Sequence, residues 1–67
     1  MTTINVTAQE LIKFRESQKL SQYAFAQVLG VTAGAVKLWE EEKRSISPTN
    51  SKVIRLFIKY PQLVKEF

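Results

Sequence analysis

Few side chains in this sequence could take part in catalysis. The chain has no Cys and no His, and its six acidic residues are all Glu. Thiol chemistry, imidazole chemistry and the usual zinc sites are therefore excluded. The Glu residues stand singly except for the run at 40–42, and no carboxylate pair or phosphate-binding loop is recognisable. We expect no enzymatic activity, no cofactor and no metal site.

The remaining polar groups favour binding through charge and hydrogen bonds. Ten Lys and Arg residues against six Glu give a net charge of +4 and a pI near 9.7. A pI above about 9 in so small a domain is typical of nucleic-acid-binding proteins. Composition alone fits a solvated surface with excess Lys equally well, so the choice depends on where the polar groups lie.

The segment VTAGAVKLWEEEK, residues 31–43, poses this question most directly. Its apolar residues recur at helical spacing, which predicts a helix. Gly34 and Leu38 within it have no side-chain group that forms hydrogen bonds. The neighbouring Thr32 and Lys37 can form them.

Four helices and a short last turn are predicted to position these groups. Apolar residues recur at helical spacing, and Pro61 should stop or kink the last long helix. The predicted spans are 8–18, 22–29, 33–41 and 48–60, with a last turn at 62–67. A hydroxyl residue that can cap the helix precedes each of the first four: Thr7, Ser21, Thr32 and Ser47. Thr7 and Glu10 also fit a capping box.

The helices should share one core within a single domain, residues 1–67. Hydrophobic residues make up 45% of the chain, which is enough for a core. The expected inward residues of the second, third and fourth helices are Phe25, Ala26, Leu29, Val36, Trp39, Val53, Leu56 and Phe57. No apolar run approaches the ~20 residues needed to cross a bilayer. The first residues lack the basic segment followed by an apolar segment that is typical of a signal peptide, so we expect a cytoplasmic protein.

Gly30 marks a tight turn between the second and third helices. A residue directly after a helix often needs a positive φ, which costs Gly nothing. Two helices joined by so short a turn must cross steeply. Residues 21–41 are therefore predicted to form a helix-turn-helix.

The segment LSQYAFAQVLGVTAGAVKLWE, residues 20–40, resembles the helix-turn-helix of the XRE and Cro/repressor family of bacterial and phage regulators. The shared pattern has Leu-Ser-Gln, an Ala four residues after the Gln, Leu-Gly-Val-Thr, and Trp-Glu at the end. The resemblance covers about residues 8–60. It implies an all-α, lambda-repressor-like domain of four to five helices that binds double-stranded DNA.

The resemblance also implies a role for individual residues. The helix that starts near Thr32 would lie in the major groove, and the positions facing the bases are Thr32, Ala33, Gly34, Lys37 and Leu38. Contacts to the phosphates would come from Ser21, Gln22, Lys43, Arg44 and Ser45. Arg15 and Glu40 would form a partly buried ion pair that joins the first helix to the third.

The groove-facing set departs from the Gln- or Arg-rich surface usual in these proteins. Lys37 can donate to guanine, while Ala33 and Leu38 can touch thymine methyl groups. One explanation is recognition through a single Lys, methyl contacts and the shape of the duplex. The other is a protein-interaction module that has kept the fold and binds DNA weakly and without sequence preference.

The expected function is that of a sequence-specific transcriptional regulator, a repressor, acting as a homodimer on an inverted-repeat operator. The apolar residues near the C-terminus could form the dimer contact: Tyr60, Leu63, Val64 and Phe67. A short last helix that only covers the core is an equally good account of them. The resemblance also leaves open an antitoxin that represses its own operon and binds a toxin protein. It implies a bacterial or phage-infected cell, with the protein at the nucleoid.

Overall fold

The structure, a computed structural model, describes residues 6–66 and is all-α over that range. Four α-helices are followed by a short 3-10 helix, with no strand among the described residues. The bounds are α1 Ala8–Ser17, α2 Gln22–Leu29, α3 Ala33–Glu40, α4 Pro48–Lys59 and η1 Pro61–Glu66. Every predicted helix is present, and α1, α3 and α4 each end one residue earlier than predicted, because that residue is the cap.

Each predicted cap is formed by the hydroxyl expected to make it. Ser21, Thr32 and Ser47 each accept a hydrogen bond from the backbone N–H three residues later. At α1 the capping box is complete, since the Thr7 hydroxyl accepts from the Glu10 N–H while the Glu10 carboxylate accepts from the Thr7 N–H. These bonds satisfy first-turn amides that have no partner within the helix.

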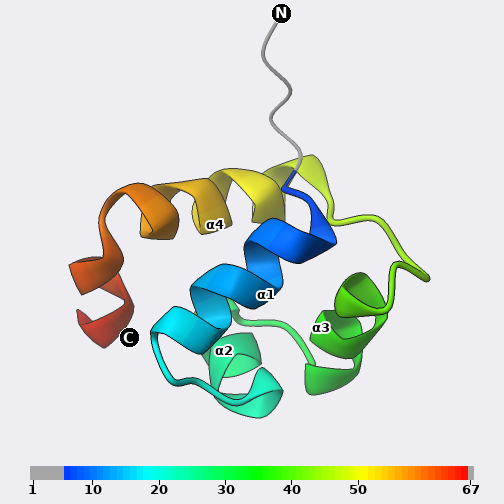
Figure 1. The fold of residues 1–67 in the computed structure, drawn as a ribbon, viewed down its shortest axis with the longest axis horizontal. Coiled ribbons are helices and arrows are strands. Elements are labelled where there is room, and N and C mark those ends of the chain that lie inside the picture. The colour runs from blue at the N-terminus through cyan, green and yellow to red at the C-terminus, as the bar shows by residue number, and fades with distance from the viewer. Residues whose placement is uncertain (1–5, 67) are drawn as a thin grey trace, which may run out of the picture.

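The turn between α2 and α3 has the geometry expected for Gly30. Its φ is +77°, and the N–H of Val31 donates to the carbonyl of Ala26 at 3.0 Å. This bond closes the end of α2 and turns the chain into α3, so that the two helices pack against each other (Figure 1). Residues 21–41 therefore form a helix-turn-helix.

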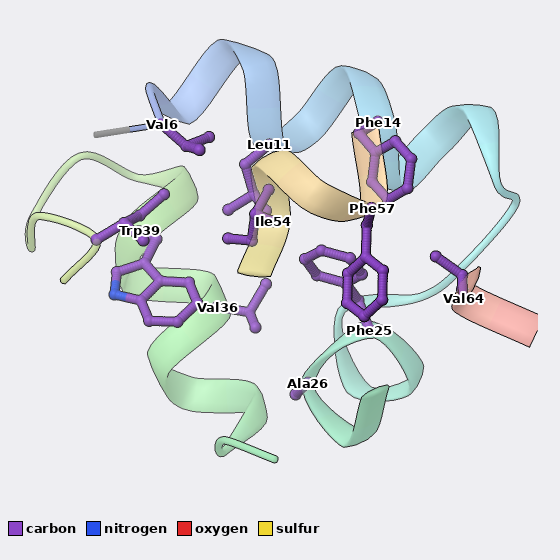
Figure 2. Close-up of a cluster of buried hydrophobic side chains, with 11 residues drawn as sticks. Val6, Leu11, Phe14, Phe25, Ala26, Val36, Trp39, Ile54, Phe57 and Val64 are labelled. Atoms are coloured by element: carbon purple, nitrogen blue, oxygen red, sulfur yellow. The ribbon is translucent and has the colours of Figure 1, made fainter. Parts of the chain in front are cut away.

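One hydrophobic cluster draws on all four α-helices and η1 (Figure 2). Phe14 of α1 and Phe25 of α2 meet edge to face, with ring centroids 6.1 Å apart. The buried members are Val6, Leu11, Phe14, Phe25, Ala26, Val36, Trp39, Ile46, Ile54, Phe57 and Val64.

The face that α4 turns inward differs from the predicted one. Leu56 was expected in the core but is 49% exposed, and Ile54 is fully buried instead. Apolar residues at 53, 54, 56, 57 and 58 surround more than half of this helix, so their spacing fits more than one inward face. Ser51 lies on the same face as Ile54, is fully buried, and accepts a hydrogen bond from the N–H of Val6 at 3.1 Å.

Candidate nucleic-acid interface

A hydrogen-bonded network fixes α1, α2 and α3 relative to one another. The Arg15 Nε lies 2.6 Å from Glu40 Oε2, and the Arg15 Nη2 donates to Glu40 Oε1 at 3.1 Å. This is the ion pair expected between the first and third helices, and both side chains are largely buried. The Arg15 Nη1 also donates to the carbonyl of Leu20, just before α2. Hydrogen bonds to Glu40 raise the pKa of Arg15 above its ordinary value, so the guanidinium stays charged.

Gln22 belongs to the same network. Its Nε2 donates to Glu40 Oε1 at 2.9 Å, and the side chain is half-buried. An amide group has two N–H donors, so one remains beyond this bond. The bond holds the N-terminus of α2 beside the end of α3, and therefore beside the loop that follows Glu40.

The N-terminus of α2 has the properties of an anion-binding end. The Ser21 side chain caps it through the N–H of Ala24, and no acidic residue lies in the first turn. The amides of the first turn have no acceptor within the helix, and the helix dipole adds partial positive charge there. Such an end suits a phosphate group.

Helix α3 has one buried side and one open side. Val36 and Trp39 are buried in the core and fix the helix against it. On the other side Gly34 and Lys37 are exposed, as is the capping residue Thr32. The Thr32 oxygen accepts from the N–H of Ala35, so its hydroxyl hydrogen remains available to a ligand.

The other two predicted base-facing residues, Ala33 and Leu38, are half-buried. Ala33 packs partly against the core, which reduces the methyl surface it can offer. The open side of α3 therefore presents one cation, one hydroxyl and a small apolar area. Lys37 is its only long polar side chain.

The loop after α3 is attached to the core at both ends. Trp39 anchors it at the end of α3 and Ile46 anchors it before α4, each with 5% of its side chain exposed. Between them Lys43, Arg44 and Ser45 are exposed, and Lys43 Nζ lies 3.5 Å from a carboxylate oxygen of Glu41. Exposed pairs at this distance contribute little to stability, so Lys43 can exchange this partner for a phosphate.

Two exposed residues of α2 were not predicted as site residues. Tyr23 is 64% exposed, and its hydroxyl oxygen accepts a hydrogen bond from Gln27 Nε2 at 2.8 Å. The phenol hydrogen therefore remains free to donate. An aromatic hydroxyl and an amide four residues apart on the polar side of a helix were the signal in the sequence.

The predicted dimer residues are only partly available. Val64 is 6% exposed and belongs to the chain's own hydrophobic cluster (Figure 2), so it offers little surface to a second copy. The chain turns after Lys59, so that η1 lies below the end of α4 and does not continue in line with it (Figure 1). Leu63 packs partly against the core, Tyr60 is 41% exposed, and Phe67 lies outside the described residues.

No helix within residues 6–66 is both long enough and apolar enough to span a bilayer. A search of curated proteins found no match to the chain. The family model described as Helix-turn-helix matches residues 11–60, which is most of the chain and includes α2, the turn and α3. The match extends from the middle of α1 to the end of α4, the range over which the sequence resembles the XRE regulators. The chain therefore belongs to the helix-turn-helix family of XRE-type DNA-binding regulators.

Proposed function

We propose that this protein is a sequence-specific transcriptional repressor that binds its operator as a homodimer, with α3 in the major groove. The observation that carries the proposal is the two-sided environment of α3. Val36 and Trp39 are buried, while Thr32, Gly34 and Lys37 stand open on a helix of the diameter that the major groove admits.

Phosphate contacts are proposed from two segments next to the end of α3. The network through Glu40 holds the N-terminus of α2 beside this end, and the loop with Lys43, Arg44 and Ser45 follows directly after it. Contacts of this kind fix the register of a protein on the duplex but do not read its sequence. In this proposal sequence is recognised by Lys37, by the Thr32 hydroxyl and by methyl contacts from Ala33 and Leu38.

The dimer contact is proposed on the C-terminal half of α4. After Val64 is assigned to the core, Leu56 and Tyr60, four residues apart and therefore on one side of the helix end, remain 49% and 41% exposed. We propose that this surface of α4, with Leu63 at its edge, forms the contact. Two half-sites one helical turn apart would then compensate for the small interface of one domain.

Selection of binding sites from a random duplex pool tests the proposal. We expect enrichment of an inverted repeat, and sedimentation of the complex with the selected duplex should give two chains per duplex. Enrichment of a single half-site bound by one chain would contradict the dimer. A pool that shows no enrichment, with weak and uniform binding, would contradict sequence-specific regulation.

The second candidate is a protein-interaction module on the same fold. It is favoured by the single long polar side chain on the open side of α3 and by the exposed apolar residues of α4. It predicts weak affinity for all duplexes alike, and the selection described above separates it from the repressor.

A further inference from the structure

A groove lies over Trp39, between the start of α1 and the loop after α3. Its volume is about 300 Å³. Trp39 and Ile46 line it from the core, the segment before α1 forms one wall, and Glu42, Arg44 and Ser45 form the other. We refer to this space as the Trp39 groove. It is not part of the surface of α3 that would face the bases.

The indole N–H of Trp39 has no hydrogen-bond acceptor among residues 6–66. Only 5% of Trp39 is exposed, but its indole nitrogen is not sealed inside the protein. Figure 2 shows this nitrogen at the edge of the ring that points away from the core, on the side of the loop after α3. Buried Trp residues normally place this N–H against a partner, and here the donor is open to a ligand that accepts a hydrogen bond.

The other groups around the Trp39 groove favour an anionic ligand. The indole N–H is a donor without acceptor capacity, and Arg44 adds up to five more donors with a permanent positive charge. Ser45 adds a hydroxyl that can donate. A planar guanidinium beside further N–H and O–H donors suits the oxygens of a phosphate group.

The position of the groove identifies which phosphate group would reach it. The Trp39 groove opens beside the last turn of α3 and the first residues of the following loop, so a duplex that receives α3 has a backbone strand close to it. We propose that the Trp39 groove binds one phosphodiester of the DNA backbone, with the Trp39 Nε1–H, the Ser45 hydroxyl and the Arg44 guanidinium as donors. This inference rests on the proposed DNA-binding function and adds Trp39 to the residues that contact DNA.

Glu42 opposes this ligand and gives the inference a second test. Its carboxylate lines the Trp39 groove and would repel a phosphate. Glu42→Gln removes that charge, and we expect binding to tighten by about two- to fivefold on every duplex, since charge interactions across solvent are small. Glu16→Gln on the exposed surface of α1 is the matched control with the same change in net charge. Equal effects of the two substitutions would contradict a phosphate in the groove.

The direct test uses the fact that the chain has a single Trp. The wild-type protein labelled with nitrogen-15 gives one indole N–H resonance, which is followed while a short duplex is added at low salt. We expect a downfield shift of the indole proton and slower exchange with solvent in the saturated complex. An indole resonance that keeps its shift and exchange rate while the protein is fully bound overturns the inference and leaves the proposed function standing. If no duplex binds at all, the proposed function itself fails.

A substitution pair separates the N–H from the packing of the ring. Trp39→Phe loses the donor and some packing, whereas Ile46→Val, in the same groove, loses only packing. Among variants shown to be folded, we expect Trp39→Phe to bind every duplex about tenfold more weakly than Ile46→Val. The slope of log affinity against log salt should stay unchanged, because no charge is removed. Equal affinities of the two variants would contradict the proposed contact.

Discussion

Replacing each of the two glycines by alanine should change stability in opposite directions, although neither new methyl group meets an obstacle. At Gly34 an added Cβ would have the Thr32 hydroxyl at 3.9 Å as its nearest contact, and at Gly30 nothing lies within 4 Å. The space around the added methyl group therefore does not distinguish the two sites. The backbone does, because Gly34 lies within α3 and Gly30 has a φ of +77°.

The magnitudes follow from the backbone. Gly34→Ala removes the entropic disadvantage of glycine in a helix, which stabilises the protein by about 0.5–1 kcal/mol. In a domain of this size that raises the Tm by roughly 2–8 °C. Gly30→Ala forces an L-residue into the left-handed region at about 1–2 kcal/mol, partly offset by the stiffer unfolded chain. We expect a net loss near 1 kcal/mol.

Urea unfolding followed by circular dichroism measures both effects on proteins that differ by one methyl group. The reasoning is refuted if Gly34→Ala lowers the midpoint or if Gly30→Ala leaves it unchanged. The same Gly34→Ala protein also tests the role of this position on DNA. Weaker binding by a more stable protein would indicate that the backbone of α3 approaches the duplex closely at Gly34, and unchanged binding would indicate a neutral position.

Three further changes test the network, the base contact and the first cap. Arg15→Ala leaves the largely buried carboxylate of Glu40 without its cation and should destabilise the fold by about 3 kcal/mol. The control Arg44→Ala, on the exposed loop, should change the free energy of unfolding by less than about 0.5 kcal/mol. Equal losses in urea unfolding would contradict the buried pair. Lys37→Ala should weaken DNA binding by about 1–3 kcal/mol and relax specificity at one base pair. A uniform loss of affinity across duplexes in competition assays would mean that Lys37 touches only phosphate. The pKa of Glu10 is lowered, first by the hydrogen bond from the Thr7 backbone and then by the hydrogen bond from Arg55 of α4, whose Nη1 lies 3.0 Å from Glu10 Oε2. Its charged form therefore stabilises the fold at a pH above its ordinary pKa. The stabilisation is lost as the pH falls below 4.5, the ordinary pKa of Glu, and then through the lower pKa of Glu10 in the folded protein. Glu10→Gln should therefore flatten the acid side of the curve of stability against pH. An unchanged acid side would contradict the prediction.

Local features of the fold could be predicted from the sequence. Each of the four caps is a hydrogen bond between residues three apart, and the bond that closes the turn at Gly30 joins residues five apart. Such interactions need no knowledge of the rest of the chain. The pattern from Leu20 to Glu40 similarly predicted the helix-turn-helix, since its turn and inward residues are set within one short segment.

The last part of the chain shows where this reasoning stops. The apolar residues of α4 fit more than one inward face, and only packing into the shared core selected Ile54 over Leu56. The direction of η1 decided that Val64 packs into the core and leaves little of its surface exposed. Neither choice is encoded by spacing within one helix.

The candidate site divides in the same way. Its residues on α3 and in the loop could be named from the sequence, because they follow from the helix-turn-helix pattern. The bond from Gln22 to Glu40 and the Trp39 groove between the start of α1 and the loop join residues far apart in sequence. The tertiary structure alone decided them, because the free energy of such contacts depends on the relative placement of helices, which no local pattern determines.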